Sequence, residues 1–443
     1  MVAPLWALWE RSPYLRTYRH MLRSQYEPPE SIAEKQLAKL VESAGHAYAT
    51  TPFWKERFDG AGIRPADLRS LDDLRRLPIL SKTDIREQGP RMRSSAYPDE
   101  SALHRFKTSG STGVPLETCC DEACAQFKRA AVLRSDEWSG WRLGERIASI
   151  WGNPQLRTDL RGKIRNALLE RRYVFLDTLK TDVAAMRRFT EILERTPPSL
   201  LFGHAHSLYL YADFLRKNST APPIRPNGII STCMVLHDFE RKSIREVFEC
   251  EPTDRYGCEE VGLIASECER HEGLHLNADC LYVELIDFEG RPVVGDKPGR
   301  IVITDLVNRA MPLFRYEIGD TAVWSRRTCS CGRTLPMFAR IEGRIADYVI
   351  TKSGDYISGI SLTENFACMV SGIAQLQIVQ ESLDRFTFNI VKGPDFGEES
   401  LRRIAALVAD RFGSDVGFEC RYTDRIPQEP SGKYRFCISN VPR

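Results

Sequence analysis

Residues 107–115, KTSGSTGVP, form the segment whose side chains are most suggestive of chemistry. Hydroxyl groups alternate here with glycines, in the order Thr108, Ser109, Gly110, Ser111, Thr112 and Gly113. Such a loop offers backbone N–H groups and hydroxyl donors to phosphate oxygens. It is not a Walker A loop, because Val114 and Pro115 stand where that motif requires Lys and Ser or Thr. Alone, the segment fits a solvated turn equally well.

Cysteines and histidines form a second group of reactive side chains. Cys329 and Cys331 make a C-x-C pair, and far upstream Cys268 precedes His271 and His275. Three thiolates and one imidazole would complete a closed tetrahedral zinc site, which is structural because no position is left for water. The C-x-x-H spacing favours His271, but the choice between the histidines stays open. The alternative is a set of free thiols beside a surface histidine.

The composition limits the classes of function. The chain has 443 residues, with 62 basic and 60 acidic side chains and a net charge of +2. A net charge this small produces no electrostatic field over the whole protein that would attract nucleic acid or an anionic membrane. The apolar stretches are shorter than the roughly 20 residues of a membrane span, and the N-terminus shows no signal peptide. We therefore expect a cytoplasmic protein of two or three domains.

Short apolar runs at residues 147–151, 200–202 and 229–230 each end in a Gly, Ser or polar residue, and residues 182–193 between them predict a helix. This alternation is typical of an α/β domain whose sites lie where strands end. The residues at these ends, where a binding site is expected, are Trp151, Gly152, Gly203, His204 and His206.

The two ends of the chain predict further elements. Ser31 and Glu34 have capping-box spacing and predict a helix over residues 32–45. Residues 275–287 and 300–306 are predicted to be extended and joined by a Gly/Pro-rich turn. The last hundred residues predict a separate small α+β domain. Its elements are an alternating strand at 386–390, a helix at 401–412 closed by Gly413, and an extended stretch at 417–422.

Four further segments place the hydroxyl-rich loop in a known series. They are DRYGCEEVG (254–262), YEIGD (316–320), GRIAD (343–347) and PSGKYR (430–435). Together with the loop they resemble the ordered motifs of the adenylate-forming superfamily of acyl-CoA synthetases, luciferases and adenylation domains. Leu116 after Pro115, CERHEGLHL at 268–276 and CSCGR at 329–333 resemble the phenylacetate-CoA ligase family and its relatives from capsule and polysaccharide clusters.

This resemblance implies a fold and a division into domains. The expected fold is α/β, with a large N-terminal multi-layer domain of the adenylate-forming type over residues 1–344. A small mobile C-terminal α+β domain would occupy residues 345–443 and carry a catalytic lysine. In the family the small domain closes on the large one for adenylation and then turns about a hinge for thiolation.

The resemblance also implies roles for the nucleotide-binding residues. The loop from Thr108 to Gly113 would cradle the β and γ phosphates of ATP. Tyr256 and Gly257 would line the adenine pocket, and Asp320 would accept the ribose hydroxyls. Arg344 would reach the ribose or phosphate region.

Two catalytic residues follow from the same motifs. Glu260 matches the carboxylate that helps to hold Mg²⁺, although Glu259 beside it could take that role. Lys433 matches the lysine that bridges the substrate carboxylate and the α-phosphate during adenylation. Relatives carry a comparable cysteine–histidine cluster, and the family-like GLH segment favours His275 as its histidine.

Two departures from the family pattern affect the second half-reaction. Ala346 stands where relatives often have an acidic hinge residue, so that either Asp347 takes the role or the step is altered. Met234 stands where relatives often have Glu. Both departures leave adenylation intact as an expectation and bear on the acceptor step.

The expected function is an ATP-dependent acid ligase. It would activate an aryl or small organic acid as acyl-AMP with release of pyrophosphate, and then transfer the acyl group to CoA. One alternative is an amide-forming ligase with an amine acceptor, an amino sugar or amino acid, and no CoA; another is a non-catalytic nucleotide-binding protein. The expected partners are small molecules and no nucleic acid or membrane, with the chain as a monomer or homodimer.

Overall fold

The computed structural model divides the chain into two compact units, each treated by itself. It describes residues 13–108, 116–151, 173–178, 182–218, 224–233, 236, 238–287, 289–342, 348–352, 356–358, 362, 366, 369–426 and 437–441. The larger unit comprises Met1–Phe106, Glu117–Leu176 and Asp182–Gly343. The smaller unit comprises Lys107–Leu116, Asp177–Thr181 and Arg344–Arg443. The division into domains with separate functions stays a prediction.

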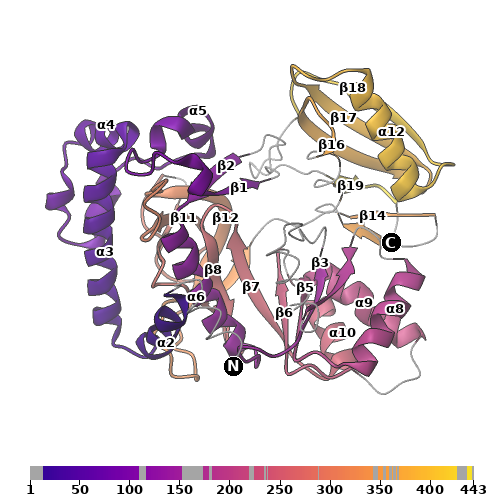
Figure 1. Cartoon of the computed structure of the whole chain (residues 1–443), viewed down its shortest axis with the longest axis horizontal. Coiled ribbons are helices and arrows are strands. Elements are labelled where there is room, and N and C mark those ends of the chain that lie inside the picture. The colour runs from indigo at the N-terminus through magenta and orange to yellow at the C-terminus, as the bar shows by residue number, and fades with distance from the viewer. Residues whose placement is uncertain are drawn as a thin grey trace. The chain divides into compact units, whose positions relative to one another are not determined.

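An 11-stranded mixed sheet organises the larger unit, in the order β10-β11-β12-β13-β9-β8-β7-β6-β5-β3-β4 (Figure 1). Neighbouring strands in one half are parallel: β3 (Ile147–Trp151), β5 (Leu200–His204), β6 (Gly228–Thr232) and β7 (Pro252–Cys258). Strand β4 (Tyr173–Asp177) lies at the edge beside β3. The apolar runs predicted to be strands are confirmed as β3, β5 and β6.

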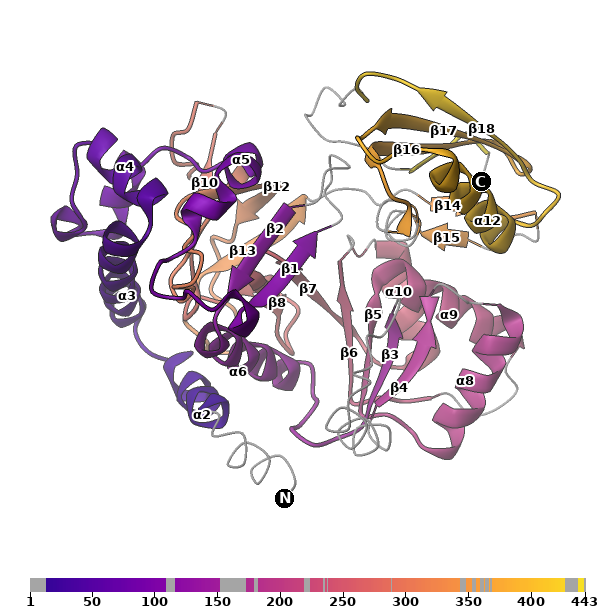
Figure 2. The same ribbon diagram turned by 45° about the horizontal axis from the view of Figure 1, so that its top comes forward.

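Three helices cover one face of the parallel half, as Figure 2 shows. They are α8 (Val183–Arg195), α9 (Ala205–Asn218) and α10 (Asp238–Phe248). Every second residue of the strands enters this core, including Ile150, Leu201 and Ile229. Asp182 caps α8 by accepting a hydrogen bond from the N–H of Ala185, so the helix predicted there is confirmed.

Antiparallel strands make up the other half of the sheet. They are β8 (Gly262–Glu267), β9 (Leu274–Leu276), β10 (Leu281–Ile286), β11 (Gly299–Asp305), β12 (Tyr316–Trp324) and β13 (Met337–Glu342). The prediction of one continuous extended stretch over 275–287 is wrong, because a turn interrupts it. The N–H groups of Cys280 and Leu281 both bond the carbonyl of Asn277, and this turn divides the stretch into β9 and β10.

Helices from the N-terminal part pack beside the antiparallel half (Figure 2). They are α2 (Tyr14–Ser24), α3 (Pro29–Thr50), α4 (Pro52–Gly60) and α5 (Lys82–Met92), with short 3₁₀ turns at Pro65–Asp67, Leu71–Arg76 and Glu100–Ala102. Helix α3 begins three residues before the predicted start, because Pro29 occupies its first turn. Ser31 therefore lies inside the helix and bonds Glu27 instead of capping.

A two-stranded ribbon and one long helix complete the described N-terminal part. Strands β1 (His104–Thr108) and β2 (Leu116–Cys120) pair with each other. Helix α6 (Glu122–Trp138) follows, and Asp121 caps it by accepting from the N–H of Cys124. The phosphate-loop candidate therefore joins β1 to β2. Among the described residues, no helix has both the length and the apolarity that a membrane crossing requires.

The smaller unit has an α+β arrangement. Its main sheet has the order β18-β17-β16-β19, formed by Gly417–Tyr422, Arg385–Lys392, Ile373–Ser382 and Cys437–Ser439. Helix α12 (Glu398–Phe412) packs its apolar side on this sheet, and Gly413 with φ of 104° ends it as predicted. A separate ribbon consists of β14 (Tyr348–Ile350) and β15 (Tyr356–Ser358).

Candidate functional site

The hairpin of β7 and β8 carries three of the predicted site residues: Tyr256, Gly257 and Glu260. The two strands lie so close together here that position 257 requires glycine. A Cβ on Gly257 would lie 2.6 Å from the carbonyl oxygen of Gly262. Gly262 itself has φ of +79°, which a residue with a side chain rarely adopts. The DRYGCEEVG motif thus encodes a tight turn that holds its functional side chains close together.

Tyr256 and Asp320 are brought together as the sequence motifs require. The Tyr256 hydroxyl donates to Oδ2 of Asp320 at 2.8 Å. Strand β7 and strand β12, which carries Asp320, are separated by three strands in the sheet, so their contact requires the antiparallel half to curl. The predicted adenine wall and the predicted ribose acceptor therefore lie side by side.

Glu260 forms a second contact with strand β12. The Tyr316 hydroxyl donates to Oε1 of Glu260 at 2.9 Å, and both side chains are buried. Glu259, the alternative, is exposed. Sequence reasoning did not single out Tyr316, although it is the first residue of the YEIGD motif.

A buried arginine fixes the start of β12. Arg315 adopts φ of 51°, and its guanidinium pairs with Glu284 at 3.1 Å and donates to the carbonyl oxygens of Arg75 and Leu77. Leu80 then bridges to Tyr316 as a short parallel pairing. The ion pair of Arg315 and the backbone pairing with Leu80 thus fix the position of Tyr316, whose hydroxyl points at Glu260.

We expect Tyr316→Phe to lower the free energy of unfolding by about 1.5–3 kcal/mol, because a buried carboxylate loses a hydrogen-bond donor. Urea denaturation measures this change. The matched control is Tyr26→Phe, at a ring that is half exposed, where a change within about 0.5 kcal/mol is expected. Equal stability of the two variants would show that Tyr316 does not support Glu260.

Several predicted residues lie outside the described part of the chain. These are the loop residues Ser109, Gly110, Ser111, Thr112 and Gly113, together with Gly152, Met234, Arg344, Ala346, Asp347 and Lys433. The backbone of Thr108 ends β1, and that of His206 belongs to α9, but their side chains are not described. The roles of all these residues stay predictions.

Four side chains converge into a group that could hold a metal ion: Cys268, His275, Cys329 and Cys331. Their ligand atoms all lie within 4.8 Å of one another. The Sγ atoms of Cys268 and Cys329 are 3.6 Å apart, and Sγ of Cys331 is 3.4 Å from Nε2 of His275. Tetrahedral zinc with ordinary bond lengths would place two sulfurs about 3.8 Å apart and a sulfur and a nitrogen about 3.6 Å apart. The donor set and the spacing therefore fit zinc.

His271 is not part of this group. Its Nδ1 lies 3.0 Å from Oε2 of Glu267, and its backbone has φ of 52°. His275 instead lies in β9, between the cysteine after β8 and the C-x-C loop before β13. Burial lowers the pKa of His275 to about 4, so its imidazole is neutral at pH 7, the form that binds metals.

Backbone and aromatic contacts surround the four side chains. The N–H of Arg270 donates to Sγ of Cys268 at 3.5 Å, and the N–H of Arg333 donates to Sγ of Cys331 at 3.4 Å. Burial opposes ionisation of Cys331, but the donors from Arg333 lower its pKa. An apolar cluster shields the group from water, formed by Ile32, Trp138, Ala278, Leu335 and Met337.

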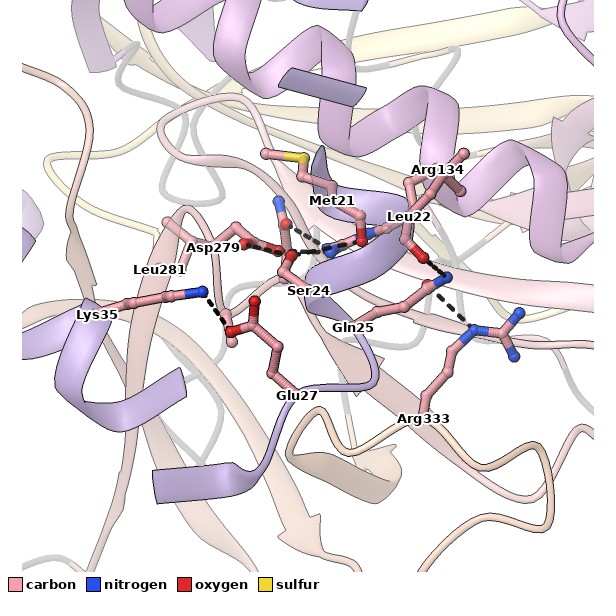
Figure 3. A network of polar contacts seen from close by, with 12 residues as sticks. Met21, Leu22, Ser24, Gln25, Glu27, Lys35, Arg134, Asp279, Leu281 and Arg333 are labelled. Atoms are coloured by element: carbon pink, nitrogen blue, oxygen red, sulfur yellow. Dashed lines mark hydrogen bonds and ion pairs between the residues drawn. The ribbon is translucent and has the colours of Figure 1, made fainter. Parts of the chain in front are cut away.

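A polar network connects the C-x-C loop to the N-terminal helices (Figure 3). Oε1 of Gln25 accepts from Nε1 of Trp138 at 2.9 Å and from Nε of Arg333 at 3.2 Å. Buried Arg134 reaches Asp279 and Oδ1 of Asn277, in the turn between β9 and β10. The candidate metal group is therefore linked to the end of helix α2 and to helix α6 through side chains that sequence reasoning did not predict.

The ends of the parallel strands bring together some of the residues expected there. The rings of Trp151 and His204 are 4.1 Å apart at 40°, and the rings of Trp151 and Phe202 are 5.2 Å apart at 25°. Gly203 lies against the backbone of β3, where a Cβ would be 2.9 Å from the carbonyl oxygen of Ile150. Gly203 therefore serves strand packing, while the aromatic rings form a wall.

Comparisons with known proteins identify a family domain and several similar chains. Residues 349–440 match the CapK C-terminal domain. The chain is 26% identical over 342 residues to a phenylacetate-coenzyme A ligase of Thermus thermophilus, covering 73% of each chain. It is 21% identical over 374 residues to protein CapK of Staphylococcus aureus, covering 83% of this chain and 81% of that protein.

A solved structure gives the same result for the fold. The structure of 2-hydroxyisobutyryl-CoA ligase in complex with 2-HIB-AMP and CoA matches with a TM-score of 0.64 and 22% identity, covering 95% of this chain and 92% of that one. The predicted resemblance and the predicted fold class are confirmed by these comparisons.

Proposed function

We propose that this chain, whose homologues are named phenylacetate-CoA ligase and CapK and whose fold is that of adenylate-forming ligases, is an ATP-dependent carboxylic acid ligase. It joins an aryl or small organic acid to AMP, releases pyrophosphate, and passes the acyl group to CoA. The observation that carries the proposal is the pairing of Tyr256 with Asp320 and of Tyr316 with Glu260. These contacts bring the DRYGCEEVG and YEIGD motifs, which are distant in sequence, together at one site.

The paired residues suit nucleotide binding. The two oxygens of the Asp320 carboxylate can accept both ribose hydroxyls, and Tyr256 offers its ring to the adenine. A carboxylate oxygen of Glu260 is the hard donor that Mg²⁺ prefers. When bound, that ion would neutralise charge on the phosphates. Tyr316 keeps the Glu260 carboxylate oriented for this role.

The reaction proceeds in two displacement steps. A carboxylate oxygen of the acid attacks the α-phosphorus of ATP, and the bond to the bridging oxygen breaks to release pyrophosphate. The CoA thiol, after losing its proton, then attacks the acyl carbonyl, and AMP leaves. The first step brings two anions together, so the protein must supply positive charge and alignment. Arg344 and Lys433 are proposed to supply the positive charge, and the loop from Thr108 to Gly113 is proposed to align the phosphates through its N–H and hydroxyl donors.

We also propose a structural zinc ion bound by Cys268, His275, Cys329 and Cys331. Three thiolates and one imidazole leave no coordination position open for water, which excludes a catalytic role for this ion. Cys268 directly follows β8, His275 lies in β9, and Cys329 and Cys331 lie in the loop before β13. The ion would therefore hold these segments together beside the adenylate motifs. A cytoplasmic location, where thiols stay reduced, suits such a site.

Release of pyrophosphate over a panel of carboxylic acids tests the proposed activity. We expect release that depends on the acid, AMP as the nucleotide product, and capture of the acyl-adenylate as a hydroxamate by hydroxylamine. Addition of CoA should convert the same acid into a thioester. Product formation with amino sugars or amino acids but not with CoA would instead support the amide-forming alternative. Absence of pyrophosphate release with every acid would refute ligase activity.

A further inference from the structure

One face of the parallel sheet carries a row of aromatic and polar side chains that the proposed chemistry has not yet used. The strand pairing places Phe202 opposite Ile230 and His204 opposite Thr232. Alternate residues such as Leu201 and Ile229 enter the core beneath α8, α9 and α10. Because side chains alternate along a strand, Phe202 and His204 lie on the opposite face.

The aromatic rings on this face form a continuous wall at the carboxyl ends of the strands. Trp151 of β3 stacks on Phe202 and lies close against the His204 ring. Trp151 and Phe202 are only half-buried, whereas His204 is 3% exposed. A flat surface of this kind fits a planar aromatic ring better than a branched aliphatic chain.

Two buried polar atoms on the same face have unmet hydrogen-bonding capacity. Within the described part of the chain, neither Nδ1 of His204 nor Oγ of Ser149 has a hydrogen-bond partner. Ser149 lies opposite Phe202 in the strand pairing, two residues before Trp151. Burial lowers the pKa of His204 to about 4, so the ring is neutral at pH 7, with one nitrogen donating and the other accepting. Buried polar atoms of this kind are normally satisfied, so a ligand group is the natural partner.

The position of this wall relative to the nucleotide motifs is set by the sheet. His204 lies opposite Thr232, which in turn lies opposite Arg255, the residue before Tyr256. Two strand spacings separate His204 from Arg255, a distance of roughly 10 Å. The side chain of Arg255 is already paired with Asp136. An aromatic acid whose carboxylate meets the α-phosphate would span a distance of this order.

We propose that His204 is a substrate-binding residue that recognises an uncharged hydrogen-bonding group, a hydroxyl or an amino group, on the ring of an aromatic carboxylic acid stacked against Trp151. The inference rests on the proposed ligase function and names its substrate class. A charged ring substituent is disfavoured because the His204 imidazole is neutral and Arg255, the charged residue of β7 on this face, is paired with Asp136. The aromatic wall orients the ring of the substrate, and His204 selects the substituent on that ring.

Steady-state kinetics with benzoate, 4-methylbenzoate and the 3- and 4-hydroxy and amino benzoates test the inference by pyrophosphate release. The wild-type chain is expected to favour at least one hydroxy or amino acid over benzoate and 4-methylbenzoate by about tenfold or more in kcat/KM. His204→Leu should remove that preference, so that the kcat/KM values for the substituted acids and for benzoate become equal within about threefold in the variant. His204→Gln, which keeps a donor and an acceptor, should restore part of the preference. His20→Leu, at an exposed position in α2, is the control and should change neither value.

The outcomes separate the two proposals. If no acid supports pyrophosphate release, the ligase function itself fails. If the wild-type chain is active but prefers aliphatic or unsubstituted acids, or if His204→Leu keeps the substituent preference, the inference is overturned and the ligase function stands. Thermal unfolding checks each variant, and the Gln variant decides if the Leu variant does not fold. The preference should also stay constant between pH 6 and about 8, because the ring stays neutral there.

Discussion

Replacement of Lys433 by alanine is expected to lower acyl-adenylate formation by about 100- to 1,000-fold and to leave ATP binding nearly unchanged. The substrate carboxylate and the α-phosphate are both anions, so a lysine between them stabilises the transition state more than either ground state. Removing one preorganised charge of this kind typically costs that much in rate. Hydroxamate trapping measures adenylation, and nucleotide titration measures ATP binding.

A second measurement separates the half-reactions. Synthetic acyl-AMP supplied with CoA bypasses adenylation, so the Lys433→Ala variant should form the thioester at nearly the wild-type rate. The matched control is Lys392→Ala, since Lys392 lies in β17 of the same unit with its ammonium 3.6 Å from the centre of the Tyr422 ring. That variant should adenylate normally. Full adenylation activity in Lys433→Ala would remove the role assigned to the PSGKYR motif.

The elements could be predicted where a single local signal determines them. The strand at residues 147–151 coincides with β3, and the helix closed by Gly413 coincides in its C-terminal end with α12. The start of α3 was predicted wrongly, because a proline at the first turn outweighs the capping-box spacing of Ser31 and Glu34. The break between β9 and β10 was missed, because the turn at Asn277 depends on two backbone hydrogen bonds and not on Gly or Pro.

The candidate site shows the same division between local and long-range information. The motifs identified Tyr256, Glu260 and Asp320, and the structure brings Tyr256 and Asp320 into contact. Tyr316 was overlooked because its partner lies across a curled sheet, and no residue spacing in the sequence reports that curl. The aromatic wall could not be predicted without the register between β3 and β5, which places Trp151 beside His204. Individual side chains were therefore predictable, whereas their hydrogen-bond partners were not.

Loss of the metal group is expected to destabilise the larger unit strongly. We expect one zinc ion per chain by elemental analysis of protein purified without chelators. Cys329→Ser should lose the ion and lower the free energy of unfolding by about 5 kcal/mol or more, because binding energy at a structural zinc site is folding energy. The control Cys250→Ser, at a half-buried cysteine outside the group, should keep the ion and most of the stability.

The two histidines give the sharpest form of this test. His275→Ala should release zinc, since Nε2 of His275 lies 3.4 Å from Sγ of Cys331, whereas His271→Ala should retain it, since His271 contacts Glu267 instead. Loss of zinc should also increase amide hydrogen exchange around Gln25, because that side chain bonds Arg333 in the C-x-C loop. Equal zinc content in the two histidine variants would contradict the assignment of His275. Zinc-free wild-type protein with unchanged stability would discard the metal site and leave the adenylation proposal standing, because none of the four ligands contacts Tyr256, Glu260 or Asp320 among the hydrogen bonds of the described residues.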